Sequence, residues 1–450
     1  MHKTVVIDIV GLSSSLIGAS TPFLKEYISQ RNTSLIAPML PAVTTAVQST
    51  YVTGKWPAEH GIVGNGWYDR TDAEIKFWKQ SNKLVHGEKI WDRAKQLDPS
   101  FTVSKMFWWY NMYSTADYTV TPRPNYLADG RKMPDCYSHP AELRDELQKE
   151  FGQFPLFKFW GPGADITSTK WIADASVCTD KKYNPTLTLI YLPHLDYCLQ
   201  KYGPDHPLIN SHLLEIDTIV KDLVKHYTST GAKIILLSEY GICSVDRPIH
   251  INRSLRKENL LAIRIERGLE LLDAGASKAF AVSDHQVCHI YINDATVEAK
   301  VKSLITKLPG VSLVLDKAAQ KQMNIDHERS GDFVLMTDQR SWFTYYFWLD
   351  DTVAPDYARE VDIHKKPGYD PVELFMSSKA RAAYKLLRKK SGLRYVMDVI
   401  PLDATLVKGS HGSTHIEEKY HPILITDGPC PTNLVATDVY DIIWSHLNSD

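Results

Sequence analysis

Short runs of continuously apolar residues, separated by helical patterns, are the feature that most constrains the fold of this chain. A strand that is covered on both faces reads as such a run. Four runs bounded by turn residues are therefore predicted to be buried strands: Thr4–Ile9, Leu187–Leu192, Lys233–Leu237 and Pro422–Thr426. Apolar residues recur at helical spacing in five further stretches: 44–53, 139–149, 166–177, 208–228 and 434–447. This alternation predicts an α/β fold, with a mostly parallel sheet and helices on both faces.

Two long segments depart from the alternation. Residues 105–160 are rich in aromatic side chains and prolines, and residues 245–400 add a strand-like run at Val287–Ile292 and a helical pattern near 295–307. A chain of 450 residues has room for one large domain with insertions. We predict that both segments are insertions that form a cap. The single discontinuous core is then expected to comprise about 1–104, 161–244 and 401–450.

The charge balance and the cysteines limit the partners and the location. The chain has 51 Lys and Arg against 53 Asp and Glu, a formal charge of −2, so no global field attracts it to nucleic acid or to an anionic membrane. No apolar stretch approaches the roughly 18 residues of a membrane-spanning helix. The six cysteines show no close pairing, and Met1 leads directly into the first strand. We predict a cytoplasmic protein with reduced thiols that binds a small molecule.

The stretch between Pro41 and Asn65 carries the most chemical information. Thr44 stands at the start of a predicted helix, where its hydroxyl lies beside free backbone N–H groups and the positive end of the helix dipole. Such a position binds phosphate and lowers the cost of forming an alkoxide. The alternative is that Thr44 only caps its helix.

This stretch resembles the nucleotide pyrophosphatase/phosphodiesterases and phosphonoacetate hydrolase, of the alkaline phosphatase superfamily. The resemblance rests on the spacing from Thr44 through Val52-Thr53-Gly54 to His60-Gly61-Ile62-Val63-Gly64-Asn65. It implies an alkaline-phosphatase-like core in which Thr44 is the nucleophile. It also implies that Asn65 helps to hold a phosphoryl oxygen.

The same resemblance implies metal ligands, and two of them are present. Asp196 follows the strand at 187–192, where open α/β sheets bind ligands, and resembles the family's aspartate ligand. His411, in Ser410-His411-Gly412, matches the final histidine ligand. Four residues after Asp196, where the family has a histidine, this chain has Gln200.

Two further positions depart from the family. After the strand at 233–237 the family has Asp-His-Gly, whereas this chain has Glu239, Tyr240 and Gly241. Glutamate can ligate a metal, but tyrosine is a poor substitute for imidazole. At the first strand the family's aspartate is replaced by Val10. Asp8 lies on the same strand face, and we expect it either to reach the metal site or to be a paired core carboxylate.

Other residues could complete the ligand set. His194 lies two residues before Asp196 and is expected on the same strand face, so we assign it, with Asn65, Gln200 and Tyr240, to substrate binding. His364, in a dense group of acidic and histidine residues at 362–370, is predicted as a metal ligand beside Asp8, Asp196, Glu239 and His411. Looser candidates are His250, Asp284, His285 and His289.

Together these features predict a metal-dependent phosphohydrolase, a phosphodiesterase or a phosphatase. It would use one or two divalent ions, zinc in the first place and manganese as the alternative, and form a phosphothreonine at Thr44. The expected substrate is a small phosphorylated metabolite. One alternative is a catalytically impaired relative that binds a phosphorylated ligand, because the family's ligands are lost at 200 and 240. Another is a phosphonate or sulfate ester hydrolase, although sulfatases use a modified cysteine or serine where this chain has Thr44.

Overall fold

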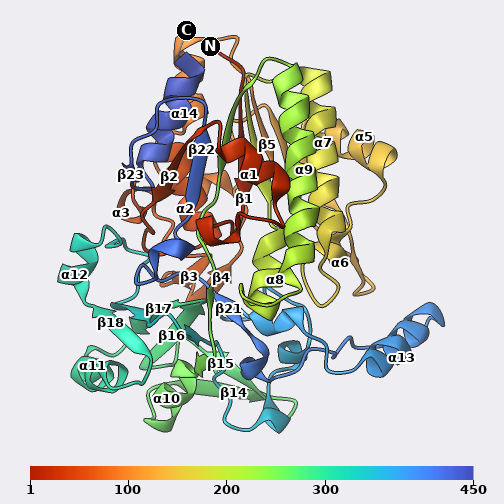
Figure 1. Ribbon diagram of the computed structural model, residues 1–450. Helices are drawn as coiled ribbons and strands as arrows, with labels where there is room; N and C mark the ends of the chain where they lie inside the picture. Colours follow the sequence, from red (N-terminus) through yellow and green to blue (C-terminus); the bar gives the residue numbers. More distant parts are fainter. Residues whose placement is uncertain (449–450) are drawn as a thin grey trace.

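A nine-stranded sheet forms the centre of the protein, whose computed structural model describes residues 1–448 (Figure 1). Its strands, in spatial order, are β23 (Asn433–Leu434), β2 (Asn32–Ile36), β22 (Ile423–Thr426), β11 (Lys233–Leu237), β1 (Thr4–Ile9), β10 (Leu187–Leu192), β5 (Val103–Met106), β6 (Tyr118–Pro122) and β9 (Cys136–His139). β1 runs parallel to β10 and β11, and parallel pairing continues through β5 to β6. β22 and β9 are antiparallel to their neighbours. The predicted α/β class with a mostly parallel sheet is confirmed.

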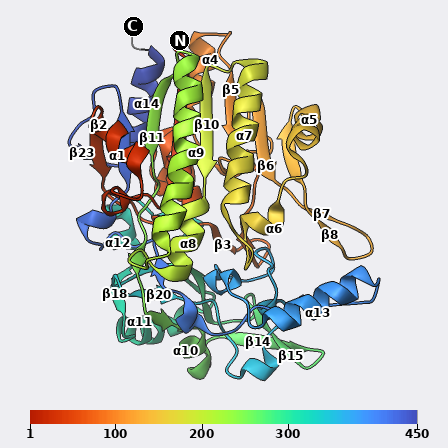
Figure 2. The same cartoon turned by 45° about the vertical axis from the view of Figure 1, so that its right-hand side comes forward.

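Helices cover both faces of this sheet (Figure 2). One face packs against α1 (Pro22–Ile28), α7 (Ile166–Tyr183), α8 (His194–Tyr202) and α9 (Ile209–Ser229). The other packs against α2 (Thr44–Thr53), α4 (Ile90–Leu97) and α14 (Asp438–Asn448). Side chains alternate along β1, so Ile7 faces the α9 layer whereas Val6 faces the α2 layer. By the same alternation Asp8 lies on the α2 side.

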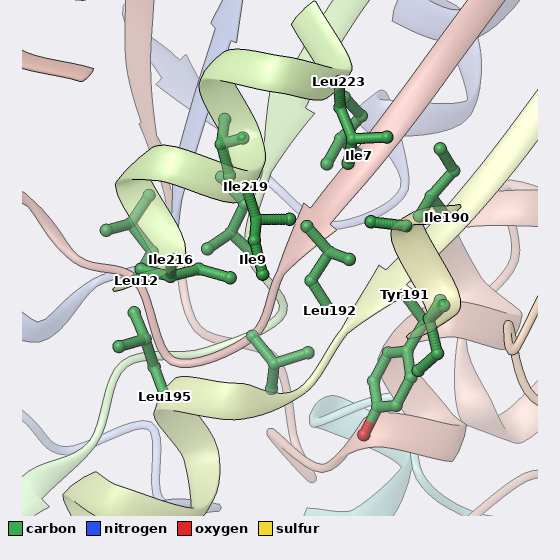
Figure 3. Close-up of a cluster of buried hydrophobic side chains, with 14 of the residues drawn as sticks. Ile7, Ile9, Leu12, Ile190, Tyr191, Leu192, Leu195, Ile216, Ile219 and Leu223 are labelled. Carbon is green, nitrogen blue, oxygen red and sulfur yellow. The ribbon is translucent and has the colours of Figure 1, made fainter. Parts of the chain in front are cut away.

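The layer beneath α9 shows why these segments fold as predicted. Apolar side chains of the two central strands pack against one face of α9 (Figure 3). The strands contribute Ile7, Ile9, Ile190 and Leu192. The helix contributes Ile216, Ile219 and Leu223, which recur at helical spacing. Each fully buried aliphatic side chain contributes roughly 2 kcal/mol to folding. The predicted strands at 4–9, 187–192 and 233–237 are confirmed residue for residue.

The prediction that residues 105–160 form part of a cap is wrong. This segment supplies β6 and β9, which extend the central sheet beyond β5, and α5 (Ala141–Phe151), which packs against α7. Its aromatic side chains are packing residues: the ring of Phe107 lies 4.8 Å from that of Phe154 and 5.9 Å from that of Trp171. The proline and aromatic content concealed short strands that belong to the sheet.

Residues 245–400 build a separate layer at the lower end of the molecule in Figure 1. Its centre is a four-stranded antiparallel sheet in the order β16 (Ala279–Asp284), β17 (Val287–Ile292), β19 (Phe333–Thr337) and β18 (Val311–Leu315). Its helices are α10 (Ile251–Lys257), α11 (Glu298–Thr306), α12 (Lys317–Gln322) and α13 (Lys379–Lys390).

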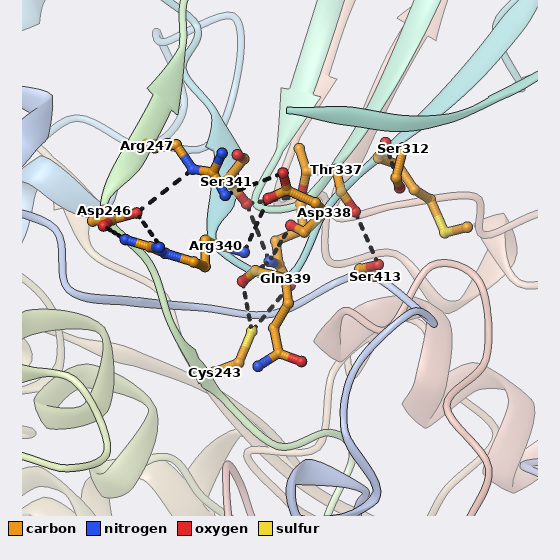
Figure 4. A network of polar contacts seen from close by, with 12 residues as sticks. Cys243, Asp246, Arg247, Ser312, Thr337, Asp338, Gln339, Arg340, Ser341 and Ser413 are labelled. Atoms are coloured by element: carbon orange, nitrogen blue, oxygen red, sulfur yellow. Dashed lines mark hydrogen bonds and ion pairs between the residues drawn. The ribbon is translucent and has the colours of Figure 1, made fainter. Parts of the chain in front are cut away.

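A polar network joins this lower layer to the core (Figure 4). The thiol of Cys243, which precedes the lower layer, donates to the carbonyl of Gln339 at 3.3 Å. Within the lower layer, Arg247 pairs with Asp338 at 3.3 Å. Ser413, two residues beyond the predicted ligand His411, donates to the carbonyl of Thr337 at 3.3 Å. The lower layer is therefore tied to the segment that carries a candidate site residue.

The remaining elements are short. The helices are α3 (Pro57–His60) and α6 (Leu156–Phe159). The strands pair as β3 (Gly66–Asp69) with β4 (Glu74–Phe77), β7 (Asn125–Tyr126) with β8 (Lys132–Met133), β12 (Cys243–Ser244) with β21 (Gly409–Ser410), β13 (Arg247–Ile249) with β20 (Ser341–Phe343), and β14 (Ala262–Glu266) with β15 (Leu269–Asp273). Within residues 1–448, none of the helices has the length and apolar character that crossing a bilayer requires.

Candidate functional site

Thr44 is the first residue of α2, as predicted. The preceding residue, Val43, is extended (φ −133°, ψ 149°), so the helix begins abruptly at Thr44. The Thr44 side chain is not a cap; its Oγ1 lies 3.0 Å from the hydroxyl of Tyr240 and also interacts with the carboxyl of Glu239. Thr44 is only 4% exposed, so its hydroxyl is buried.

Asn65 lies beside the start of α2. Its Oδ1 accepts from the backbone N–H of Thr45 at 3.2 Å. Its backbone N–H and its Nδ2 donate to the two oxygens of Asp284, at 2.7 and 3.1 Å. Asp284 ends β16 in the lower layer, so a residue of that layer orients the amide predicted to hold a phosphoryl oxygen.

Asp8 and Glu239 form a buried carboxyl pair, and Gln48 connects them. Gln48 Nε2 donates to Glu239 at 2.5 Å and to Asp8 at 3.4 Å, while its Oε1 accepts from the backbone N–H of Trp109 at 2.6 Å. Burial raises the pKa of both carboxyls, and the proximity of Glu239 raises the pKa of Asp8 further. The pair is therefore expected to share a proton.

Asp196 and His411 form a second group on the other side of Thr44. Asp196 Oδ1 lies 3.3 Å from the hydroxyl of Tyr240 and 3.6 Å from His411 Nε2. His411 Nδ1 donates to the carbonyl of Ala42 at 2.7 Å, so its Nε2 presents a lone pair to the carboxyl. Burial raises the pKa of Asp196 to about 7.

These two groups fit divalent ions, although incompletely. Within residues 1–448, His411 Nε2, Asp8 Oδ1 and Glu239 Oε2 are buried atoms without hydrogen-bond partners. The Nε2 lone pair of His411 and Asp196 Oδ1 face each other at 3.6 Å, and either a proton on the carboxyl or a cation between the two atoms relieves their repulsion. Two ligand atoms that each lie about 2.1 Å from one ion are separated from each other by a distance close to the 3.6 Å between Asp196 and His411. Asp196 with His411 suits one ion, and the outer oxygens of Asp8 and Glu239 suit another.

Gln200 and Tyr240 lie beside the position formed by Asp196 and His411. The family resemblance predicts histidines at both of these positions. Gln200 Nε2 donates to Asp196 Oδ2 at 2.9 Å, and its Oε1 accepts from Tyr369 at 3.0 Å. The ring of Tyr240 stacks on the imidazole of His411, with centroids 3.6 Å apart. Gln200 thus holds the carboxylate of Asp196 in place, and Tyr240 holds the ring of His411.

The lower layer supplies further site residues. The ring of His285 stacks on that of Tyr369, with centroids 3.6 Å apart, and lies tilted by 38° against the ring of His411, with centroids 3.8 Å apart. Its Nδ1 lies 2.8 Å from Asp284. Asp284 and His285 were only loose candidates in the sequence, and Gln48 was missed. The signal for Gln48 was its position one helical turn after Thr44, on the same face of α2.

The assignment of His194 to this site is wrong. β10 ends at Leu192 and α8 begins at His194, so His194 and Asp196 lie on a helix. Residues two positions apart in a helix are separated by about 200° around its axis, whereas residues two positions apart in a strand lie on the same face. His194 accordingly points away and lies 3.1 Å from His212.

His364 also lies elsewhere. It is exposed at the surface, beside the main chain of Phe77 and near Lys79, Lys132 and Asp362. Of the ten predicted site residues, the structure brings eight together: Asp8, Thr44, Asn65, Asp196, Gln200, Glu239, Tyr240 and His411.

Comparison with known proteins identifies a family. The profile of the type I phosphodiesterase / nucleotide pyrophosphatase family matches residues 4–370. An uncharacterised pyrophosphatase/phosphodiesterase of Schizosaccharomyces pombe is 25% identical over 269 residues, which are 57% of this chain and 47% of that protein. Ectonucleotide pyrophosphatase/phosphodiesterase 1 of Saccharomyces cerevisiae is 24% identical over 281 residues, 55% of this chain and 35% of that protein. The chain thus matches half or less of the length of these curated relatives.

Solved structures share the fold over the whole chain. Murine ectonucleotide pyrophosphatase/phosphodiesterase 5, an inactive threonine-to-alanine variant in complex with AMP, superposes with a TM-score of 0.60 at 15% identity, covering 100% of this chain and 95% of that one. Phosphonoacetate hydrolase from Sinorhizobium meliloti, in complex with phosphonoformate, gives a TM-score of 0.62 at 15% identity, covering 99% and 96%.

Proposed function

Because this chain belongs to the type I phosphodiesterase / nucleotide pyrophosphatase family, we propose that it is a metal-dependent phosphohydrolase whose nucleophile is Thr44. One observation carries the proposal: the Thr44 hydroxyl begins a helix and lies between Tyr240, which contacts Asp196, and the carboxyl of Glu239. A helix N-terminus favours a phosphoryl group, and the acidic groups around it favour cations that neutralise the group's charge.

The metal would be held by Asp196 and His411, with a second ion at Asp8 and Glu239. Zinc suits the mixed nitrogen and oxygen ligands of the first position, and manganese is the alternative. Bound divalent ions supply charge that stabilises both the attacking and the leaving oxygen during displacement at phosphorus.

The residues of the chain account for the proton transfers. The carboxylate of Glu239 contacts the Thr44 hydroxyl and therefore accepts the Thr44 proton. Oγ1 then forms a bond to phosphorus while the bond to the leaving alcohol breaks, which gives phosphothreonine. Glu239 passes the Thr44 proton to the leaving alkoxide. Water then attacks the phosphorus and the bond to Oγ1 breaks. One proton of the water reaches Oγ1 through Glu239, and phosphate leaves, or a phosphomonoester where the substrate was a diester. Asn65 and the N–H groups of α2 stabilise the added charge on the phosphoryl oxygens.

The substrate proposed is a phosphodiester or phosphomonoester of a small metabolite. The murine relative was solved with AMP and the bacterial one with phosphonoformate, so related folds bind small phosphoryl or phosphonate compounds. The inactive murine variant replaces one threonine by alanine, which supports a threonine nucleophile. All six cysteines are free thiols, which supports the cytoplasmic location predicted from the sequence.

The test compares Thr44→Ala with Thr44→Ser on p-nitrophenyl phosphate and bis-p-nitrophenyl phosphate, with added zinc or manganese. We expect Thr44→Ala to lose at least about 10³-fold in kcat and Thr44→Ser to retain part of the activity. Thr53→Ala, at the other end of α2, is the matched control and keeps full activity. Undiminished turnover by Thr44→Ala would refute the assignment.

A second candidate function is binding of a phosphorylated ligand without hydrolysis. Gln200 favours binding without hydrolysis. Its amide donates to Asp196 Oδ2, and it stands where the family has a metal-binding histidine. Elemental analysis separates the two proposals. About two more divalent ions per chain in the wild type than in the double variant Asp196→Ala, Glu239→Ala supports the enzyme, whereas equal contents together with phosphate-ester binding support the binder.

A further inference from the structure

The helix α8 presents two pairs of side chains, each pair separated by one turn. Asp196 and Gln200 face Thr44, as described above. His194 and Cys198 lie on the opposite side of the helix and face α9, which contributes His212 and Glu215. The residues of this second side play no part in the proposed hydrolysis.

The second side brings together four metal-ligating groups. His194 Nε2 lies 3.1 Å from His212 Nδ1, and each of these nitrogens lies 3.3 Å from Glu215 Oε2. The three atoms form a nearly equilateral triangle. Cys198 Sγ and one ring nitrogen of each histidine all lie within 4.8 Å of one another.

The edges of this triangle match the spacing of ligand atoms around tetrahedral zinc. Ligand atoms at about 2.0–2.1 Å from zinc are separated by about 3.3 Å. Donation from both rings to Glu215 would explain the two edges at the carboxylate, but it would leave two N–H groups facing each other at 3.1 Å. Two imidazoles, a thiolate and a carboxylate form a mixed donor set that zinc accepts.

The site is also enclosed and reachable. His194 and Cys198 are buried, and within residues 1–448 the Nδ1 of His194 has no hydrogen-bond partner. Glu215 is 44% exposed, which leaves one side open to solvent. A cavity of about 40 Å³ adjoins the cluster and is lined by His194, Cys198 and His212. Lys201, on the same wall, directs its ammonium over the rings of Tyr202 and Phe375, at 5.5 and 5.9 Å.

We propose that His194, Cys198, His212 and Glu215 form a zinc site that joins α8 to α9. It is separate from the ions proposed beside Thr44 and does not depend on the proposed hydrolysis. Because α8 carries Asp196, zinc bound here would fix the position of that residue from the opposite side of the helix.

The experiment measures zinc and cobalt binding by the full chain. The protein is stripped with a chelator and dialysed against zinc sulfate, and the zinc per chain is then determined by mass spectrometry. We expect His212→Gln to bind one zinc ion fewer than the wild type. His206→Gln is the matched control, because His206 is an exposed histidine that stacks on Tyr202 outside the cluster. It is expected to keep the wild-type content.

Cobalt identifies the ligands. The cobalt-loaded wild type is expected to show a thiolate-to-cobalt charge-transfer band in the near ultraviolet. Cys198→Ser is expected to lack this band, whereas His411→Ala, which alters only the Thr44 site, keeps it. Absence of the band from the wild type would overturn the proposal, and so would equal zinc contents for His212→Gln and the wild type.

A surface substitution covers the case in which His212→Gln does not fold. Glu215→Gln removes the exposed ligand and is expected to weaken zinc binding at least about tenfold in a chelator competition. It should also reduce the rise in Tm that zinc produces in the wild type. An unchanged affinity for Glu215→Gln would refute the four-ligand site.

Discussion

The imidazole of His411 lies flat against the ring of Tyr240, with centroids 3.6 Å apart and planes inclined by only 5°. The ring and the hydroxyl of Tyr240 therefore have different roles. The ring orients His411, and the hydroxyl contacts both Thr44 and Asp196. A tyrosine at a position where relatives have a metal-binding histidine thus acts on the site through its neighbours.

Replacement of Tyr240 by phenylalanine separates these roles. The stack on His411 remains, so the fold and the metal content are expected to stay unchanged. The hydrogen bonds to Thr44 and Asp196 are lost, and we expect kcat to fall about 10- to 100-fold with little change in KM. Steady-state kinetics on bis-p-nitrophenyl phosphate measures the split. A fall in metal content instead would show that the hydroxyl is itself a ligand.

Gln200→His restores the residue that the family has at this position. Gln200 is one helical turn after Asp196 and already touches its carboxylate at 2.9 Å, so an imidazole there would add a third ligand to Asp196 and His411. We expect zinc to bind at least about tenfold more tightly. Competition with a zinc-binding dye measures the change, and Gln200→Leu, which adds no ligand, is the control. Equal affinities for these two variants would count against an ion at Asp196.

Asp8→Asn tests the buried carboxyl pair. Burial and the nearby Glu239 raise the pKa of Asp8, because two charges cannot coexist there without a cation. With metal removed by a chelator, the asparagine amide removes the repulsion between the two carboxylates. We therefore expect the free energy of unfolding to rise by about 1–2 kcal/mol. With zinc present the gain should shrink or reverse, since a ligand is lost. Urea denaturation with and without zinc provides the comparison, and a loss of stability in chelator would contradict this account.

His60 gives the protein an acid sensitivity that can be measured. Its Nδ1 accepts from the N–H of Ile62 at 3.1 Å and its Nε2 lies 2.9 Å from the hydroxyl of Thr50, so the ring is held neutral. Burial lowers its pKa to about 3, whereas the unfolded chain protonates near 6.5. Between these values the unfolded state binds more protons, so stability falls as the pH falls, by up to about 1.4 kcal/mol per pH unit.

His60→Gln should therefore flatten the pH dependence of unfolding between about pH 6 and 4. The variant loses some stability at pH 7, because one of the two hydrogen bonds is perturbed. Urea midpoints at several pH values distinguish the slope from the offset. The exposed His206→Gln variant serves as the control and should keep the wild-type slope.

The sequence predicted the centre of the fold well and its edges poorly. β1, β10 and β11 were found because strands covered on both faces are continuously apolar. β6 and β9 were missed because both strands are short and lie among proline and aromatic residues. Local composition does not reveal which strand a short segment will pair with.

The site shows the same division. Thr44, Asn65, Asp196 and His411 were located because their sequence context resembles that of the family, and Thr44 in addition begins a helix. His194 was misplaced because the helix begins at that residue, and the change of period from two to 3.6 turns its side chain to the opposite face. The contacts of Asp284 and His285 with the site depend on how the lower layer docks, which no local pattern encodes.

The short helix α8 has a mechanical consequence. Its two faces carry groups with different tasks, and a helix of nine residues is too stiff for one face to move without the other. Any rotation that improved the fit of His194 and Cys198 to α9 would swing Asp196 away from His411. Substitutions that loosen the packing of His194 and Cys198 against α9 should therefore alter the chemistry at Thr44, although neither side chain contacts its hydroxyl.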